Sequence, residues 1–432
     1  MTSAIVAGAA PPGALALSEH RNLRFFVLFL LYFAQGMPFG LFQVAIPAWL
    51  AQNGASAAEI GAVLALVMLP WTLKLFYCFL VDRYAFLAMG RRRPWIIVSQ
   101  TGIVAGLVIM AIVNPAASEA SLVAAFAFAI NVCSSMQDVA VDGMAIDVLP
   151  PEEIARGNGY FFSGQVLGMA LASGLGGYLI AWHGLPAALF ALAAVTAVIL
   201  GAILIVRERP GERLLPWTKG AAVQRNLDLH VGAFWPIIRD VLTAMFDRRT
   251  LLFLAALFCG GASAGLFVGL APIYSVEILG WEKDIYSGWV SQSNLVAGVL
   301  GLLFFGLIAE RWGARRVFIL VMISMAATAL TMLALQPHWG TGLVLIGFIF
   351  VFKSLNTLRL AMGSAVAMAL CTPAVAASQF TLLVAFINFG NMSASASLGW
   401  LDSLGGLPAM FTAMVVCSLT GAALAFAAKV GR

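Results

Sequence analysis

The feature that most constrains this chain is a series of long apolar segments that fills almost all of its 432 residues. A helix needs about 20 apolar residues to cross the hydrocarbon core of a bilayer. Segments of this kind lie near residues 25–50, 58–81, 94–113, 121–146, 157–181, 187–206, 250–279, 285–309, 317–335, 342–370, 378–401 and 408–428. Only 10% of the residues are charged, against about 25% in a soluble globular domain. The sequence therefore predicts an all-α membrane protein with twelve transmembrane helices.

Lysine and arginine predict how the chain is oriented. Three of the 24 lie within apolar segments, Lys283 lies in a loop on one side, and the others lie on the opposite side together with both termini. Because cytoplasmic loops are rich in Lys and Arg, both termini are expected in the cytoplasm, and we expect a bacterial inner membrane. The formal charge of +5 is read as this topology signal and as contact with anionic membrane lipids, not as nucleic-acid binding.

One long loop divides the segments into six and six. We expect a flexible cytoplasmic tail at 1–24, a six-helix bundle at 25–206, a cytoplasmic linker at 207–249 and a second bundle at 250–432. Within the linker, apolar residues at helical spacing from Phe234 to Met245 predict an amphipathic helix on the membrane surface.

The two halves carry similar loops. LVDRYAFLAMGRRRPW follows the second segment and GLIAERWGARRVF follows the eighth, and each has an acid–Arg pair, a glycine and a basic cluster. These loops resemble the loop signature of the major facilitator superfamily. The resemblance implies a major facilitator fold, two six-helix bundles with internal pseudo-two-fold symmetry, and transport by alternating access. It also implies cytoplasmic gate loops that contain Asp82, Arg83, Arg91, Arg92, Glu310, Arg311 and Arg315.

Polar residues within the apolar segments are unevenly distributed. They are scarce in the sixth and ninth segments and collect in the first, fifth, eighth and eleventh, where candidate substrate-binding residues are Gln35, Gln165, Asn388 and Asn391. A water-filled path needs such residues. Hydrogen bonding between helices also uses them, but it does not explain why they are scarce in the sixth and ninth segments.

Five charged residues lie deepest in the apolar segments: Lys74, Asp138, Asp142, Lys353 and Arg359. Each costs about 2.5–3.5 kcal/mol at the centre of a membrane, so we expect them to face an interior chamber rather than lipid. Asp138 and Asp142 are candidate proton-coupling residues. Lys74, Gln137, Lys353 and Arg359 are candidates for binding an anionic substrate. In the alternative interpretation, Asp138 forms a permanent ion pair with Lys74 or Arg359 that joins the halves.

Cysteine and histidine predict neither a metal nor a cofactor. The five cysteines lie in or beside apolar segments without metal-ligand spacing, and the four histidines lie outside them. An enzyme such as a membrane acyltransferase would need a nucleophile or base that these segments lack, so we expect no enzyme. A sensor that does not transport remains an alternative.

Three stretches carry a narrower resemblance: LPWTLKLFYCFLVDRY, GRRRPW and QDVAVDGMAIDVLPPEE. They resemble the muropeptide permease (AmpG) family, in the peptide/acetyl-coenzyme A transporter branch of the superfamily. The resemblance implies proton-driven import of an anionic small molecule such as an anhydro-muropeptide. Phe79, Ala145 and Val166 depart from that pattern, and QDVAVDG and GQVLG are similar to acetyl-coenzyme A transporters. Acetyl-coenzyme A or another bulky anion, such as a siderophore, is therefore the alternative substrate, and we expect a monomer.

Overall fold

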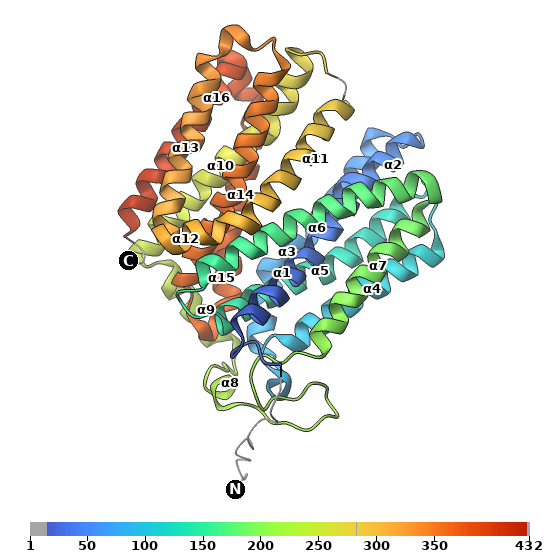
Figure 1. The fold of residues 1–432 in the computed structure, drawn as a ribbon, viewed down its shortest axis with the longest axis vertical. Coiled ribbons are helices and arrows are strands. Elements are labelled where there is room, and N and C mark those ends of the chain that lie inside the picture. Colours follow the sequence, from blue (N-terminus) through green and yellow to red (C-terminus); the bar gives the residue numbers. More distant parts are fainter. Residues whose placement is uncertain (1–14, 282, 430–432) are drawn as a thin grey trace. The chain divides into compact units, whose positions relative to one another are not determined.

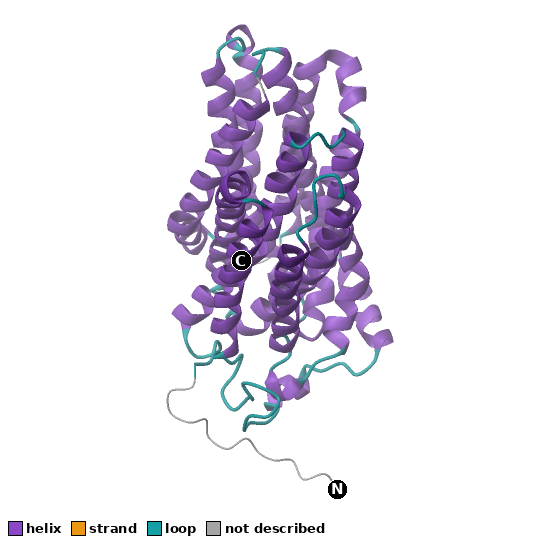
Figure 2. Cartoon of the chain, turned by 90° about the vertical axis from the view of Figure 1, so that its right-hand side faces the viewer, coloured by secondary structure: helices purple, strands orange, loops and turns teal. Residues whose placement is uncertain are grey.

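The computed structural model describes residues 15–281 and 283–429, and these residues are almost entirely helical (Figure 1 and Figure 2). Within them, twelve helical spans are long and apolar enough to cross a membrane, which confirms the predicted number. The flexible tail predicted for residues 1–24 falls mostly outside the described residues. From Leu15 onward the chain is described, and its first helix begins at Arg21.

The chain divides into two compact units. Unit 1 comprises residues 1–150, 164–241 and 372–381, and unit 2 comprises residues 151–163, 242–371 and 382–432. Two helices are divided between the units. Unit 2 includes the first residues of the helix at Ile154–His183, and unit 1 includes the first residues of the helix at Ala376–Ala396.

Unit 1 contains the first six spans. They are α1 (Arg21–Gly40), which continues through η1 (Leu41–Ala45) and α2 (Ile46–Gln52), then α3 (Ala57–Arg83), α4 (Arg93–Val113), α5 (Ala120–Val148), α6 (Ile154–His183) from residue 164 onward, and α7 (Leu185–Leu204). A short 3-10 turn, η2 (Leu87–Met89), precedes α4, and the linker forms α8 (Gln224–Asp228) and most of α9 (Phe234–Met245).

Unit 2 contains the last six spans. They are α10 (Arg248–Glu277), α11 (Lys283–Leu300) with η3 (Gly301–Phe305) and α12 (Gly306–Trp312), then α13 (Ala314–Ala334), α14 (Gly342–Leu370), α15 (Ala376–Ala396) from residue 382 onward, and α16 (Leu398–Ala428). The 3-10 turns η4 (Gln336–His338) and η5 (Pro373–Val375) precede α14 and α15.

Local sequence explains the irregular helices. Pro38 lies inside α1 and has no N–H to donate, and the helix widens into the π turn η1 three residues later. The last span is broken at Gly405 and Gly406. Gly406 has φ +62°, a conformation that glycine adopts without a steric penalty. The regular part of this span therefore begins near residue 408, as the sequence predicts.

Glycines bring α1 and α6 into close contact. A Cβ atom on Gly36 would lie 2.0 Å from the carbonyl oxygen of Gln165, and one on Gly168 would lie 2.0 Å from that of Phe33. The same packing joins α10 and α15, where a Cβ on Gly261 would lie 2.0 Å from the carbonyl oxygen of Ile387. Small residues let transmembrane helices approach at backbone distance. In both units, the first helix of the half is thus packed against the fifth.

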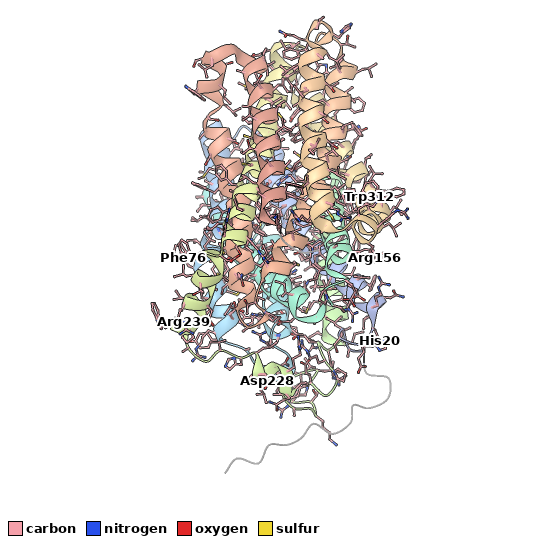
Figure 3. The ribbon with its side chains drawn as sticks, turned by 90° about the vertical axis from the view of Figure 1, so that its left-hand side faces the viewer. His20, Phe76, Arg156, Asp228, Arg239 and Trp312 are labelled. Atoms are coloured by element: carbon pink, nitrogen blue, oxygen red, sulfur yellow. The ribbon has the colours of Figure 1, made fainter. Side chains whose placement is uncertain are left out.

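Large apolar side chains cover the outside of the helices, as a bilayer requires. Phe76 on α3 and Trp312 on α12, labelled in Figure 3, are 74% and 52% exposed. Arg239, on the linker helix α9, is also exposed and pairs with the adjacent Asp240 (Figure 3).

Candidate functional site: buried charges within the helices

The centre of unit 1 holds a buried ion pair. Lys74 on α3 places its Nζ 2.6 Å from Oδ2 of Asp138 on α5. The other carboxylate oxygen of Asp138 accepts a hydrogen bond of 2.5 Å from Nε2 of Gln35 on α1. Both charged side chains are almost completely buried. Of the two partners that the sequence leaves open for Asp138, the structure pairs it with Lys74.

Asp142 lies one helical turn after Asp138 and has a different environment. Its Oδ1 accepts a hydrogen bond from the hydroxyl of Tyr32 on α1. No salt bridge to Asp142 occurs among the described residues, and its side chain is buried. Residues four apart on a helix lie on the same face. The two carboxylates are therefore neighbours, but only one has a cationic partner in direct contact.

Aromatic and amide groups surround this cluster. The Trp71 ring lies 5.5 Å from Nζ of Lys74, and its Nε1 donates to Oδ1 of Asn131 at 3.1 Å. The Tyr77 hydroxyl donates to the carbonyl of Pro70 and is hydrogen-bonded to Ser135. The site thus consists of groups from α1, α3 and α5, and every one of these helices belongs to unit 1.

Unit 2 contains two cations on α14. Arg359 is 1% exposed, and its Nε and Nη2 donate to Oδ1 of Asn356 at 3.1 and 2.8 Å. Its Nη1 is buried without a hydrogen-bond partner. Lys353 places its Nζ 5.7 Å from the centre of the Phe267 ring. Among the described residues, neither cation forms an ion pair. An uncompensated buried cation favours an anion as its ligand.

The other predicted binding residues are less closely connected to these clusters. Gln137 is buried and its Nε2 donates to the carbonyl of Leu31 on α1 at 3.1 Å. Gln165 and Asn391 are half-buried, and Asn388 is exposed. Within the described part of the chain, the side chains of these last three make no hydrogen bond. Within unit 1, the structure therefore gathers Gln35, Lys74 and Asp138 at one point, and Gln165 of the same unit makes no hydrogen bond to them.

Candidate functional site: the loop cluster

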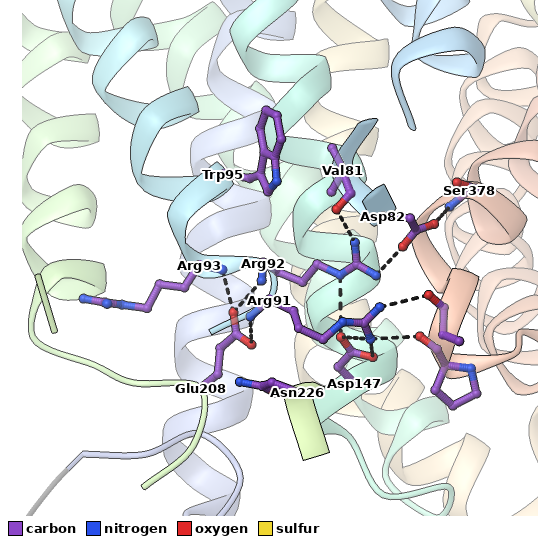
Figure 4. Close-up of polar contacts among 12 residues, drawn as sticks. Val81, Asp82, Arg91, Arg92, Arg93, Trp95, Asp147, Glu208, Asn226 and Ser378 are labelled. Atoms are coloured by element: carbon purple, nitrogen blue, oxygen red, sulfur yellow. Dashed lines mark hydrogen bonds and ion pairs between the residues drawn. The ribbon is translucent and has the colours of Figure 1, made fainter. Parts of the chain in front are cut away.

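A second charged cluster lies on the linker side of unit 1, where α3 and α5 end and α4 begins (Figure 4). Arg91 Nη1 donates to both carboxylate oxygens of Asp147 at 3.1 Å. Arg92 forms an ion pair with Asp82 and donates to the carbonyl of Val81. These four charged residues are buried, and each has an opposite charge beside it.

The same cluster holds the beginning of α15. Asp82 accepts a hydrogen bond of 2.8 Å from the backbone N–H of Ser378. Arg91 donates to the carbonyl oxygens of Pro373 at 3.0 Å and Ala374 at 2.9 Å. A carboxylate is favourable at a helix N-terminus because the free N–H groups and the helix dipole are positive there. Residues 372–381 belong to unit 1 through contacts of this kind.

Glu208 of the linker stabilises the beginning of α4. Its carboxylate accepts from the backbone N–H groups of Arg91, Arg92 and Arg93 at 3.0, 2.7 and 2.5 Å. Gly90, with φ +103°, leaves the space that this carboxylate fills, because a Cβ there would lie 2.5 Å from the Glu208 Cδ. The triple arginine is thus positioned through its backbone as much as through its side chains.

The charge states of this cluster follow from burial and neighbours. Burial and the adjacent Arg92 lower the pKa of Arg91. Burial opposes the charge of Arg92, but the carboxylates of Asp82 and Asp147 hold its pKa above the usual range. Burial and the nearby Glu208 raise the pKa of Glu212 to about 8.

In unit 2, the acid of the second loop signature also contacts the beginning of a helix. Glu310 at the end of α12 accepts from Arg156 of α6 at 3.1 and 3.3 Å. The other predicted loop arginines have different environments. Arg83 lies over the rings of Tyr84 and Phe234. Arg311 is exposed, whereas Arg315 donates to the carbonyls of Ala425 and Phe426 at the end of α16.

Several groups of these sites were not predicted from the sequence. Tyr32 lies one turn before Gln35 in the same apolar span, and that spacing is the signal that identifies it. Asn356 has the same signal, because it lies one turn before Arg359 in an apolar span, whereas Glu208 has none, since it is one of many polar residues in a loop. No cluster of three or more His, Cys, Asp or Glu residues in the described ranges is arranged to hold a metal ion.

Comparison with known proteins places these features in a family. The model of the Major Facilitator Superfamily matches residues 28–291. The anhydromuropeptide permease of Escherichia coli strain K12 is 25% identical over 402 residues, which cover 91% of this chain and 77% of that protein.

Solved structures agree in fold. The major facilitator transporter FucP in the outward conformation has a TM-score of 0.72 at 12% identity and covers 94% of this chain and 98% of its own. The human organic anion transporter MFSD10 has a TM-score of 0.69 at 15% identity, with 93% and 98% covered. The expected resemblance and the expected fold are thus confirmed: this chain belongs to the Major Facilitator Superfamily of membrane transporters.

Proposed function

We propose that this transporter imports a bulky anionic solute of the anhydro-muropeptide class across the bacterial inner membrane, together with protons and by alternating access. Both termini are proposed to lie in the cytoplasm, and the transporter is proposed to act as a monomer. The substrate class comes from the relative that is named as an anhydromuropeptide permease. The observation that carries the anionic substrate lies on α14 of unit 2.

That observation is Arg359, which is fully buried and has an unpartnered Nη1. A guanidinium remains charged under all physiological conditions, and its planar donors match the geometry of a carboxylate or phosphate. Lys353, on the same helix and also without an ion pair among the described residues, adds a second positive charge. An anionic substrate would supply the negatively charged partner that these two cations lack.

Proton coupling is proposed for the acidic residues of unit 1. Asp138 and Asp142 are buried carboxyl groups one turn apart, and Lys74 is the cation in contact with Asp138. A buried carboxyl changes its protonation when a cationic partner moves toward or away from it. Such a pair is suited to binding a proton in one stage of transport and releasing it in another.

The loop cluster is proposed as the cytoplasmic gate. The contacts that support this role are the bond from the Ser378 N–H to Asp82, those from Arg91 to the carbonyls of Pro373 and Ala374, and the pair between Glu310 and Arg156. The contacts of Asp82 and Arg91 hold the first residues of α15 in unit 1, although the rest of α15 belongs to unit 2. The pair between Glu310 and Arg156 holds the first residues of α6 in unit 2, although the rest of α6 belongs to unit 1. Breaking them would free α6 and α15 to move.

The experiment is uptake into proteoliposomes that contain the purified protein. Labelled anhydro-muropeptide is compared with labelled acetyl-coenzyme A, with and without an inwardly directed proton gradient. We expect gradient-dependent uptake of the muropeptide and a roughly 10- to 100-fold loss of apparent affinity in Arg359→Gln, which is the effect of about 1.5–3 kcal/mol for a hydrogen bond to a charged group.

Arg239→Gln is the matched control, because Arg239 is an exposed linker residue. Preferential uptake of acetyl-coenzyme A would replace the muropeptide with the alternative substrate. Equal uptake by Arg359→Gln and the control would contradict the anion site on α14.

A further inference from the structure

We infer that Asp142, and not Asp138, is the carboxyl group that carries the proton, and that the Tyr32 hydroxyl positions this carboxyl group. The inference rests on the proposed proton coupling and assigns its roles within one site. It starts from the unequal environments of two neighbouring carboxyl groups on α5.

Asp138 has the partners of an ionised carboxylate. One oxygen contacts the ammonium of Lys74 at 2.6 Å, and the other accepts from the amide of Gln35 at 2.5 Å. Both partners donate to the carboxylate of Asp138, as suits a negatively charged acceptor. A proton on Asp138 would compete with one of them.

Asp142 has no such set of donors. Among the described residues its side chain makes one hydrogen bond, from the hydroxyl of Tyr32, and that oxygen is the natural carbonyl oxygen of a neutral carboxylic acid. The side chain is 3% exposed, so water does not replace the missing cation. An ionised carboxylate in these surroundings would be a buried charge without compensation.

The balance of charge around the site leads to the same assignment. The charged and titratable groups whose fields reach Asp142 are Asp138 on its own helix, Lys74 on α3 and Tyr32 on α1. Two ionised carboxylates would share one ammonium and repel each other. With one proton on the pair, the cluster is neutral, and the proton belongs on the member without the cation.

The arrangement also indicates how the proton can move between the two carboxyl groups. Lys74 interacts electrostatically with both carboxyl groups, which lie on one face of α5. If Lys74 moves from Asp138 to Asp142, the single proton of the pair passes from Asp142 to Asp138, because the carboxyl group without the cation is the one that holds it. Movement of α3 relative to α5 would therefore change the site that is protonated.

Infrared spectroscopy of the purified protein in lipid at pH 7 tests the assignment without any substrate. A protonated carboxylic acid has a C=O stretching band that an ionised carboxylate lacks. The measurements use a Glu212→Gln background, because burial raises the pKa of Glu212 to about 8 and its protonated form would contribute a band of its own.

Within that background, we expect Asp142→Asn to remove one protonated-carboxyl band. The matched control is the charge-neutral double variant Lys74→Met/Asp138→Asn, in which the band should persist because Asp142 is unchanged. In Tyr32→Phe, the band should remain and move to higher frequency, since its C=O loses a hydrogen bond. This last variant keeps the test valid if another variant fails to fold.

Persistence of the band in Asp142→Asn, or its loss in the double variant, would overturn the assignment. If the band behaves as expected but uptake is insensitive to a proton gradient, the assignment of the proton to Asp142 is supported and the proposed coupling is contradicted. The two proposals therefore fail on different measurements.

Discussion

The ion pair between Lys74 and Asp138 gives the sharpest prediction for stability. Both side chains are buried and their charged atoms lie 2.6 Å apart. Removing one member of a buried pair costs about 3–5 kcal/mol, because the remaining charge stays in a medium that solvates it poorly. We therefore expect Lys74→Met to lower the free energy of unfolding by about 3–5 kcal/mol.

The opposite single variant should be milder. In Asp138→Asn the ammonium of Lys74 loses its direct partner, but the nearby Asp142 can lose its proton and become the carboxylate that compensates the charge of Lys74. The amide oxygen of the new side chain also still accepts from Gln35. We expect a loss of about 1–3 kcal/mol, which is the range for leaving a buried polar group unsatisfied.

The double variant Lys74→Met/Asp138→Asn completes the cycle. It leaves neither charge of the pair behind, so it should be more stable than Lys74→Met alone by about 2 kcal/mol or more. Unfolding is measured by titration with sodium dodecyl sulfate in mixed micelles, and the fluorescence of the 11 tryptophans reports it. Arg239→Gln, at an exposed ion pair, is the control and should change stability by less than about 0.5 kcal/mol. Single-variant losses that simply add in the double variant would refute the reasoning.

Three further changes test the packing, the linker and the loop cluster. Gly36→Ala should lower unfolding free energy by about 1–3 kcal/mol, because its Cβ would lie 2.0 Å from the Gln165 carbonyl, whereas Gly174→Ala, with nothing within 4 Å, should have no destabilising effect in the same titration. Glu212 has a pKa raised to about 8 from 4.5, so the folded protein holds a proton that the unfolded chain releases; this stability is present below pH 4.5 and is lost as pH rises through about 8. Unfolding measured across that range should therefore depend less on pH in Glu212→Gln, and an unchanged slope would contradict the raised pKa. Arg93→Lys should cost about 1–3 kcal/mol, because the guanidinium donates to four backbone carbonyls that a single ammonium cannot all reach; thermal unfolding equal to that of the parent would contradict this.

The fold was predictable because the bilayer imposes a length and a composition on every span. The long apolar segments predicted the helices, whereas the identity of α1 as the close partner of α6 at Gly164 and Gly168 was seen only in the structure. The break at Gly405 and Gly406 and the π turn after Pro38 were less predictable. They depend on how backbone groups are satisfied within the helix, which hydropathy does not encode.

The candidate site was predictable where charge conflicts with its surroundings. Lys74 and Asp138 stood out because each is an ionisable residue in an apolar span, but the sequence allowed Asp138 to pair with Arg359 as well. Only three-dimensional distances identified Lys74 as the partner. Tyr32 and Glu208 were not predicted, because a tyrosine in an apolar helix and a glutamate in a loop are both ordinary until their partners are known.

Proton movement that is driven by the solute tests the central claim most directly. Proteoliposomes in weakly buffered medium receive anhydro-muropeptide, and a pH-sensitive dye reports the external pH while labelled solute is counted inside. The account predicts that the medium becomes more alkaline as solute enters, and that Asp142→Asn abolishes this change. Solute entry by the unmodified protein without any change in external pH would contradict proton-coupled import.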